Sequence, residues 1–253
     1  MFNQQLFVQH LHTKQLGRPL HWFDTLSSTN STLWQLLDGG AEAGTTVIAA
    51  QQEAGRGQWG RQWQSLPGGL YLSVAIAPYL AAQKSHQLTL CSAWGLATTL
   101  RNYSLPIQIK WPNDLLLHGR KLGGILTETR LQQGQITTAV IGIGLNWSNA
   151  VPETGINLQS LDPTSIHSLE MLAAITLEGL EFGYQQWQNF GIKGLLADYL
   201  KLMTHLDQPV VVEDQVGKVI GVSEAGSLQV QFDSADPPEC LPPGTISLSY
   251  SDL

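Results

Sequence analysis

Charge is scarce in this sequence. Charged residues make up 13% of its 253 positions, with 13 Lys and Arg against 20 Asp and Glu, about half the share that is usual in soluble proteins. The formal net charge of −7 argues against a protein that binds nucleic acid non-specifically, because such binding needs a basic surface. Apolar residues still make up 43%, which excludes wholesale disorder and is enough for a sizeable core.

Cysteines, long apolar runs and export signals are also missing. The two cysteines, Cys91 and Cys240, stand far apart, so no disulfide framework or CxxC metal site is predicted. The seven histidines are scattered without zinc-site spacing. No apolar run approaches the length of a membrane span, and no basic segment followed by an apolar one opens the chain. We expect a cytoplasmic protein that does not cross a membrane.

The hydrophobic pattern predicts an α+β fold, with a mixed β-sheet flanked by helices. The first 20 residues are expected to be a short lead-in, and residues 27–30 are expected to cap the first helix. Strands are predicted near 21–23 and at 45–50, 70–77, 107–111, 115–117, 122–128 and 138–147, and helices at 31–37, 85–102 and 168–199.

The texture of the sequence changes after about residue 204. Short strands separated by turns are predicted at 210–212, 218–222, 228–232 and 245–250. We therefore expect two domains, a larger one over 1–204 and a small β-barrel, partly open, over 205–253.

A glycine-rich loop spans residues 55–60 and matches G-x-G-x-x-G. No helix follows it and no acidic residue stands about 20 positions on, so the pattern does not indicate a dinucleotide site. The loop carries Arg56 and, just beyond it, Arg61. Exposed backbone N–H groups and two arginines suit an anion that must be covered and released, although a solvated turn is the plain alternative.

The second motif is Lys110-Trp111-Pro112-Asn113-Asp114. Alternation along the preceding strand places Lys110 opposite Ile107 and Ile109, so its ammonium is expected in a cleft or in water. A lysine there can neutralise a carboxylate and a phosphate that are brought together. A surface lysine at a strand end is the alternative.

Two glycine pairs follow. Gly123 and Gly124 lie within one predicted strand, where they indicate either a close ligand or a β-bulge. Gly142 and Gly144 clear space beside another strand that ends at Asn146, a candidate metal or phosphate ligand or a simple turn residue. Trp59 and Trp63 flank the glycine loop and could stack on a flat ligand.

Together these motifs resemble those of the biotin–protein ligases. The shared segments are Ser28-Thr29-Asn30, Gln52, GRGQWGRQW (55–63), GGLYLS (68–73), KWPNDLLL (110–117), RKLGGILTE (120–128) and GIGLNW (142–147), in the family's order and spacing. The resemblance covers roughly residues 21 to 250. KWPND together with GRGxxGRxW is highly specific, whereas either motif alone is only suggestive.

The resemblance implies a two-step ligase. Biotin and MgATP give biotinyl-5′-AMP and pyrophosphate, and a lysine of a biotin carboxyl carrier domain, such as that of acetyl-CoA carboxylase, then takes the biotinyl group. It further implies a class II synthetase-like catalytic domain, an SH3-like C-terminal barrel and, for some members, a homodimer.

The resemblance also implies roles for individual residues. Lys110 and Arg56 are the expected catalytic pair. Biotin contacts are expected from Ser28, Thr29, Asn30, Gln52, Arg56, Gly57, Gln58, Lys110, Gly124 and Ile125. Nucleotide contacts are expected from Arg56, Arg61, Trp63, Asp114, Lys121 and Asn146, with Mg²⁺ arriving on ATP and Asn146 or Asp114 as its candidate protein ligands.

The sequence departs from the family pattern at Gln58, where many members have a second arginine. Glutamine can donate a hydrogen bond but cannot neutralise charge. Retention of the adenylate is therefore expected to differ.

Three other functions are weighed against the ligase. A biotin-responsive repressor needs a helix–turn–helix, and only about 20 residues precede the first predicted strand. A lipoyl or octanoyl transferase shares the architecture but is not expected to carry KWPND beside the glycine loop. A non-catalytic binding protein would not need the complete set of cations in both motifs.

Overall fold

The computed structural model describes residues 2–161, 165–233, 237–246 and 248. Its main sheet has the strand order β1-β2-β3-β8-β7-β6-β5, with β4 paired to β8. Strands β1 and β2 are parallel and the other neighbours are antiparallel. The strands are β1 (Leu20–Leu26), β2 (Thr46–Gln52), β3 (Leu70–Ile76), β4 (Leu80–Ala81), β5 (Ile107–Lys110), β6 (Asp114–Leu117), β7 (Arg120–Gln132) and β8 (Gln135–Leu145).

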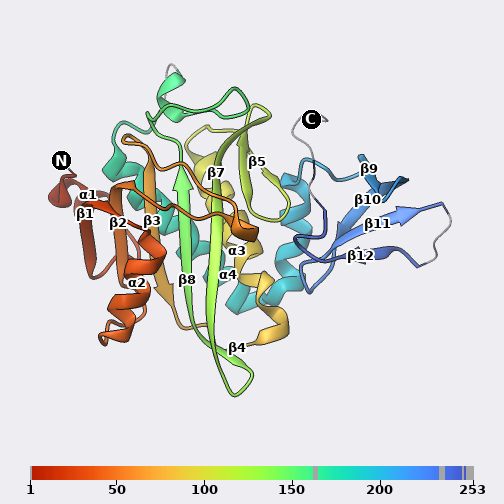
Figure 1. Cartoon of the computed structure of the whole chain (residues 1–253), viewed down its shortest axis with the longest axis horizontal. Helices are drawn as coiled ribbons and strands as arrows, with labels where there is room; N and C mark the ends of the chain where they lie inside the picture. The colour runs from red at the N-terminus through yellow and green to blue at the C-terminus, as the bar shows by residue number, and fades with distance from the viewer. Residues whose placement is uncertain (1, 162–164, 234–236, 247, 249–253) are drawn as a thin grey trace.

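Helices cover both faces of this sheet (Figure 1). The four α-helices are α1 (Gln4–His10), α2 (Thr29–Asp38), α3 (His86–Asn102) and α4 (Leu169–Leu202), and the 3₁₀ turns are η1 (Gln58–Gly60), η2 (Ala82–Lys84) and η3 (Leu158–Ser160). Helices α3 and α4 enclose the main core, whereas α2 buries Leu33 against Val47, Ala75 and Val140 on the other face. The predicted mixed sheet with flanking helices is confirmed, and none of the helices in the described part of the chain is both long and apolar enough to span a membrane.

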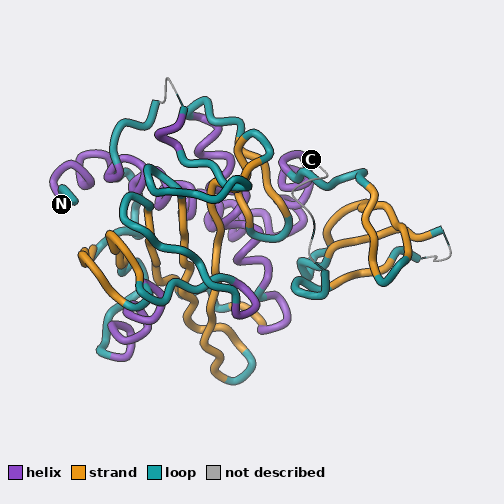
Figure 2. The backbone as a smooth tube through the Cα atoms, turned by 45° about the horizontal axis from the view of Figure 1, so that its top comes forward, coloured by secondary structure: helices purple, strands orange, loops and turns teal. Residues whose placement is uncertain are grey.

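Strand β8 lies in the middle of the sheet, as its nearly continuous apolar sequence predicts. Strands β7 and β8 form a hairpin longer than the predicted segments, and it extends beyond the neighbouring strands (Figure 2). A register shift between Leu115 and Leu116, opposite Leu122, confirms an irregularity next to Gly123. Of the two alternatives given for these glycines, the β-bulge is therefore present.

The N-terminal segment is more ordered than predicted. Residues 4–10 form α1, which the side chain of Asn3 caps by accepting a hydrogen bond from Leu6 N at 3.1 Å. Phe7 is fully buried against the core. The expectation of a mere lead-in is wrong because three buried apolar side chains, Phe2, Phe7 and Leu11, anchor this segment.

The predicted cap of the next helix is also wrong. Helix α2 begins at Thr29, two residues earlier than expected, and the side chain of Ser28 at the N-cap position accepts no capping hydrogen bond. Thr29 and Asn30 are buried in the first turn, with their side chains directed to neighbouring strands. The polar cluster therefore serves the interior between α2 and the sheet.

A separate antiparallel sheet with the order β12-β11-β10-β9 follows α4. Its strands are β9 (Pro209–Val212), β10 (Gln215–Val222), β11 (Leu228–Phe232) and β12 (Glu239–Leu241). This small C-terminal sheet is consistent with the expected SH3-like unit. Strand β12 was not predicted, and of the strand expected at 245–250, residues 247, 249 and 250 lie outside the described residues, while Thr245, Ile246 and Leu248 are not in a strand.

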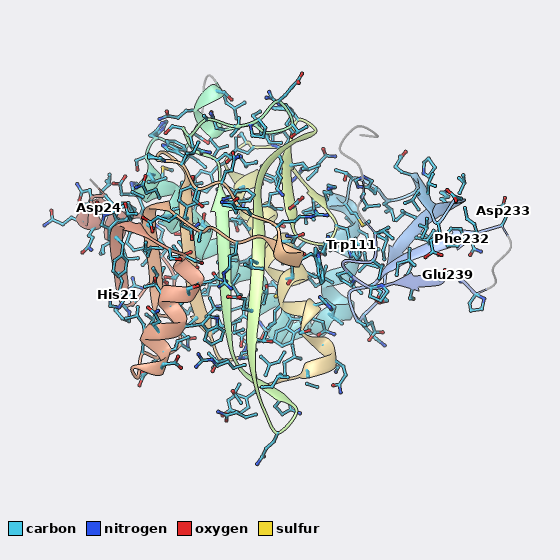
Figure 3. All side chains as sticks on the ribbon, viewed as in Figure 1. His21, Asp24, Trp111, Phe232, Asp233 and Glu239 are labelled. Carbon is cyan, nitrogen blue, oxygen red and sulfur yellow. The ribbon has the colours of Figure 1, made fainter. Side chains whose placement is uncertain are left out.

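The turn between β10 and β11 packs on the larger unit. The indole of Trp111 donates to Gly226 O at 3.0 Å, and Gln87 Nε2 donates to Glu224 O at 2.8 Å. Figure 3 shows Trp111 between the main sheet and the strands that carry Phe232 and Glu239. The C-terminal unit thus contacts the larger unit at Trp111, within the Lys110-Trp111-Pro112 segment, and at Gln87 of α3.

Candidate active site

The predicted motifs meet around one cavity of about 360 Å³. The cavity lies where the glycine loop crosses strands β7 and β8 and the turn after β5. Nearly all of the predicted site residues line it: Ser28, Thr29, Asn30, Gln52, Arg56, Gly57, Gln58, Arg61, Trp63, Lys110, Asp114, Lys121, Gly124 and Ile125. The structure therefore brings together segments that are up to 97 positions apart between Ser28 and Ile125.

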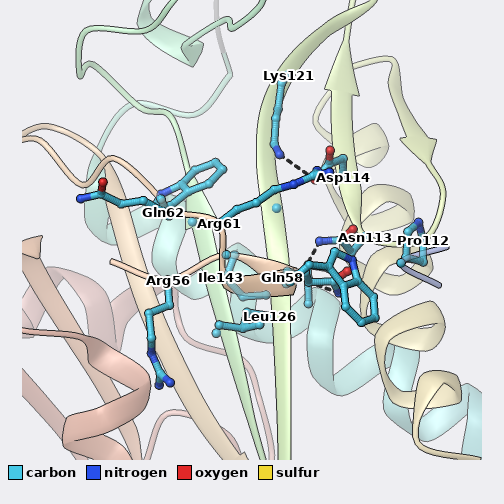
Figure 4. A pocket seen from close by; sticks show the side chains of 18 of the residues that line it. Arg56, Gln58, Arg61, Gln62, Pro112, Asn113, Asp114, Lys121, Leu126 and Ile143 are labelled. Atoms are coloured by element: carbon cyan, nitrogen blue, oxygen red, sulfur yellow. Dashed lines mark hydrogen bonds and ion pairs between the residues drawn. The ribbon is translucent and has the colours of Figure 1, made fainter. Parts of the chain in front are cut away.

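One end of the cavity is cationic. Lys121 Nζ lies 2.8 Å from Asp114 Oδ1, and Lys110 Nζ lies 3.8 Å from Asp114 Oδ2. Arg61 extends from the glycine loop toward Asp114 (Figure 4). Three cations thus surround a single carboxylate, which leaves an excess of positive charge for an anionic ligand.

Lys110 is only 6% exposed. Burial lowers the pKa of its ammonium below the usual value, nearby Lys121 and Arg61 lower it further, and the charge of Asp114 opposes the shift. A second negative charge in this cavity would stabilise the protonated form of Lys110 and would itself be stabilised. The geometry therefore favours binding of an anion beside Lys110.

The other end of the cavity holds a chain of polar side chains. The amide oxygen of Gln52 accepts from Thr29 N at 2.8 Å and from Thr29 Oγ1 at 3.1 Å, and its Nε2 donates to Ser65 Oγ at 2.6 Å. The hydroxyl of Ser73 lies within hydrogen-bond distance of both Thr29 Oγ1 and Asn30 Oδ1, at 2.7 and 2.5 Å. Such closely spaced donors and acceptors suit a small ligand head with both N–H and C=O groups.

The glycine loop closes on itself and crosses the sheet. Gly57 N donates to Arg61 O at 2.7 Å, and Trp63 N donates to Gly55 O at 2.9 Å. The guanidinium of Arg56 points away from Asp114 and Lys121 (Figure 4) and forms a double contact with Glu128, at 2.9 and 3.0 Å. Of the two loop arginines, it is therefore Arg61 that lies near Lys110.

The glycines of β7 and β8 make room for Trp63. A Cβ at Gly144 would lie 2.5 Å from the Trp63 ring, and one at Gly124 would lie 3.7 Å from it. Lys121 Nζ stands 5.2 Å from the centre of the Trp63 ring, which places a cation on its π face. Trp63 Nε1 and Gln58 Oε1 are buried and have no hydrogen-bond partner among the described residues, so both are available to a ligand in the cavity they line.

Asn146 is the one predicted site residue that the structure does not place in the cavity wall. It is buried, its Nδ2 donates to Lys121 O at 3.3 Å, and its Oδ1 accepts from Asn149 at 3.0 Å. Within the described ranges no three His, Cys, Asp or Glu side chains gather to hold a metal. Of the two predicted Mg²⁺ ligands, Asp114 lines the cavity, and its carboxylate oxygens are of the kind that Mg²⁺ prefers.

Several lining residues were missed by the sequence analysis. Gly244, Thr245, Ile246 and Leu248, beyond the C-terminal sheet, line the cavity. The exposed Trp59 of the loop lies against Gly244, where a Cβ would come within 2.9 Å of the indole. Nothing in their local sequence marks them. Glu128, in contrast, ends the quoted RKLGGILTE segment but had been given no role.

The comparisons with known proteins agree with these motifs. Residues 22–146 match the biotin/lipoate A/B protein ligase family. The chain is 31% identical to the bifunctional ligase/repressor BirA of Bacillus subtilis over 87% of this chain and 72% of that protein. It is 27% identical to the biotin–[acetyl-CoA-carboxylase] ligase of Paracoccus denitrificans over 79% of this chain and 89% of that one.

A solved structure shares the fold. The biotin protein ligase from Aquifex aeolicus in complex with biotin and ATP aligns with a TM-score of 0.73 at 24% identity, over 88% of this chain and 96% of that one. At 24% identity, this match shows a shared fold and no more. Three findings agree: the 31% identity to BirA over 72% of that protein, the match of residues 22–146 to the family model, and the meeting of the family motifs around one cavity. This chain therefore belongs to the biotin protein ligases of the biotin/lipoate A/B protein ligase family.

Proposed function

We propose that this protein is an ATP-dependent ligase that converts biotin and MgATP into biotinyl-5′-AMP and pyrophosphate. It then transfers the biotinyl group to a lysine of a biotin carboxyl carrier domain. The observation that carries the proposal is that one cavity has a neutral polar chain at one end and the buried Lys110 among cations at the other.

The neutral end suits the ureido ring of biotin. The Ser28 hydroxyl makes no capping hydrogen bond and lines the cavity, as do Thr29 and Gln52. Hydroxyl and amide groups can pair with both the carbonyl and the N–H groups of a cyclic urea. Gly124 and Ile125 on β7 offer backbone and apolar surface to the ring and tail.

The cationic end suits the reacting anions. The biotin carboxylate must attack the α-phosphate of ATP, and the two groups repel each other. Lys110 can contact both and stabilise the charge that develops as they meet. Arg61 and Lys121 add charge beside Lys110, and Trp63 offers a stacking face toward the base.

The glycine loop protects the intermediate. A mixed anhydride hydrolyses in water, so a loop over the cavity that excludes solvent preserves it until the carrier lysine arrives. The second step uses that lysine as the nucleophile and releases AMP.

Three finer points belong to the same proposal. The carrier domain is the protein partner, and the requirement for ATP favours action in the cytoplasm. A domain boundary near His205 separates the catalytic unit, 1–204, from the SH3-like unit, 205–253. The separate C-terminal sheet, β12-β11-β10-β9, supports that division.

Incubation with ATP and one carboxylic acid at a time tests the function. With biotin and Mg²⁺ we expect biotinyl-5′-AMP by mass spectrometry and biotin-dependent exchange of pyrophosphate into ATP. Lipoate and octanoate should give no adenylate. Formation of lipoyl-AMP but not biotinyl-AMP would assign the chain to the lipoate side of the family.

Gln58 gives a second prediction. Its side chain lines the cavity where many family members carry arginine, and its oxygen has no partner among the described residues. Gln58→Arg is expected to slow release of biotinyl-5′-AMP by about fivefold or more, because a charged donor binds phosphate more strongly than an amide. Dissociation of radiolabelled adenylate measures this.

The exposed Gln64, outside the cavity lining, supplies the control. Gln64→Arg adds the same charge three positions after Arg61 and should leave the release rate within about twofold, since exposed charges are screened. Equal rates for the wild type and Gln58→Arg would contradict a contact between position 58 and the adenylate.

A further inference from the structure

Glu128 is a charged residue near the cavity, with several side-chain partners, that the proposed function does not use. It lies on β7, its side chain is 26% exposed, and it is not part of the cavity lining. Three side chains converge on its carboxylate: Arg56, Asn30 and Trp34. Two of them, Arg56 and Asn30, line the cavity.

Hydrogen bonds from α2 orient the Glu128 carboxylate independently of its contact with Arg56. Asn30 Nδ2 and Trp34 Nε1, both on α2, donate to Glu128 Oε2 at 2.9 and 3.2 Å. Arg56 donates to the same oxygen at 3.0 Å and lies 2.9 Å from the other, Oε1. Bonds from α2 thus hold Glu128 in one orientation, and both of its oxygens are presented to the guanidinium. A bidentate pair of this kind is stronger and more directional than a single ion contact.

In the described part of the chain, residues 55–60 of the glycine loop make few other hydrogen bonds to the sheet, whereas Arg61, just beyond them, extends toward Asp114 (Figure 4). Beyond the hydrogen bonds that close the loop at its own base, Gln58 Nε2 lies 3.5 Å from Ile125 O, at the limit of a hydrogen bond. Trp59 lies against Gly244, where a Cβ would come within 2.9 Å of the indole. The Arg56–Glu128 pair is therefore the strongest link between the loop and β7 among the described residues.

We propose that Glu128 is a positioning residue that anchors the glycine loop over the cavity through Arg56. The side chain of Arg56 is then chiefly the loop's tether, and Arg61 is the loop arginine that faces the reacting phosphate. This inference rests on the proposed function for the identity of the ligand that the loop covers. It assigns a task to the acidic residue that closes the RKLGGILTE segment.

The direct test is Glu128→Gln, which keeps an acceptor for Asn30 and Trp34 but removes the charge that holds Arg56. Release of biotinyl-5′-AMP is expected to become at least about fivefold faster, because a hydrogen-bonded ion pair is replaced by a neutral contact. The rate of adenylate formation at saturating biotin and ATP should change by less than about twofold, since Lys110 is untouched.

Asp38 offers a matched control. It pairs with Arg130 on β7, as Glu128 pairs with Arg56, but the pair is more exposed and neither residue lines the cavity. Asp38→Asn removes the same charge from a similar arginine–carboxylate pair. It should leave both adenylate release and adenylate formation unchanged.

A double-mutant cycle decides whether Glu128 acts through Arg56. Arg56→Ala should release the adenylate at least as fast as Glu128→Gln, and adding Glu128→Gln to Arg56→Ala should have no further effect. If Glu128→Gln accelerates release by its full factor in the Arg56→Ala background, Glu128 acts through Asn30 instead and the proposal is overturned. Unchanged release in the single Glu128→Gln variant also overturns it.

Limited digestion with trypsin gives a readout without substrate. Cleavage after Arg61 reports opening of the loop, and it should be several-fold faster in Glu128→Gln than in the wild type or in Asp38→Asn. If the wild type makes no biotinyl-5′-AMP, the proposed function fails and the digestion alone tests the anchor. Equal cleavage rates in all three proteins would then overturn it.

Discussion

Alanine in place of Lys110 is expected to abolish the formation of biotinyl-5′-AMP while the protein stays folded. Lys110 is 6% exposed and stands among Asp114, Lys121 and Arg61, at the end of the cavity where two anions must meet. Removing a preorganised cation from a water-poor site costs about 10²- to 10³-fold or more in rate. Biotin-dependent pyrophosphate exchange into ATP measures the loss.

The fold is expected to survive because burial of the ammonium is itself costly. Burial lowers the pKa of Lys110, so the charged group is already destabilised in the folded protein, and Asp114 keeps Lys121 as a partner at 2.8 Å. The thermal unfolding midpoint should therefore shift by only a few degrees, about 2 to 4 °C per kcal/mol in a protein of this size. Lys201→Ala, at an exposed lysine at the end of α4, is the control and should retain full exchange. Normal exchange in Lys110→Ala would remove the basis of the mechanism.

The location of the site could be predicted because its residues stand in short, dense motifs. Burial alone does not explain three of these features. They are a lysine at a strand end, a glycine loop with two arginines, and glycine pairs in neighbouring strands. The structure gathers them around one cavity. Their individual roles remain predictions.

The directions of the two loop arginines could not be predicted from the sequence. Arg56 and Arg61 have the same charge and stand in the same flexible segment, so spacing treats them alike. What separates them is Glu128, which is 72 positions from Arg56 and is held in place by α2. The contact between Arg56 and Glu128 depends on how β7 and α2 are placed relative to each other in the folded protein. No local sequence pattern encodes that placement.

Element positions followed the patterns wherever one face is buried continuously. Strands β3, β5 and β8 and helix α3 lie within a residue or a few of their predicted bounds. The misses are of another kind. Helix α1 is too short for its periodicity to stand out. In the first turn of α2, Thr29 forms hydrogen bonds with Gln52 of β2 and Ser73 of β3 instead of capping the helix. Tertiary contacts outweighed local preference there.

The glycines of α3 and α4 have a packing role that helix propensity does not predict. Gly95 in α3 and Gly179 and Gly183 in α4 lower helix propensity, and by that measure each weakens the predicted helix. In the structure they face one another across the contact between α3 and α4. A Cβ at Gly183 would overlap Cys91 O and lie 3.0 Å from Gly95 Cα. The close approach of two backbones is the reason for glycine here.

Valine at position 183 is therefore expected to destabilise the protein severely. The clash is with backbone atoms of α3, which no side-chain rotation can relieve, so the helices must separate along their shared core. Overpacking typically costs about 1–3 kcal/mol and occasionally more. For a backbone clash we expect the upper end or beyond, a fall of about 10 °C in the unfolding midpoint. Thermal unfolding followed by circular dichroism measures it.

Gln188→Val separates this clash from the general cost of valine in a helix. Gln188 is exposed on the same helix, so its replacement carries the β-branched penalty of less than about 1 kcal/mol at a solvent-facing position. Because α3 and α4 support the strands that carry Lys110 and Glu128, Gly183→Val should also lose pyrophosphate exchange in step with its folded fraction as temperature rises. If Gly183→Val melted with Gln188→Val, the approach of the two helices would not depend on glycine.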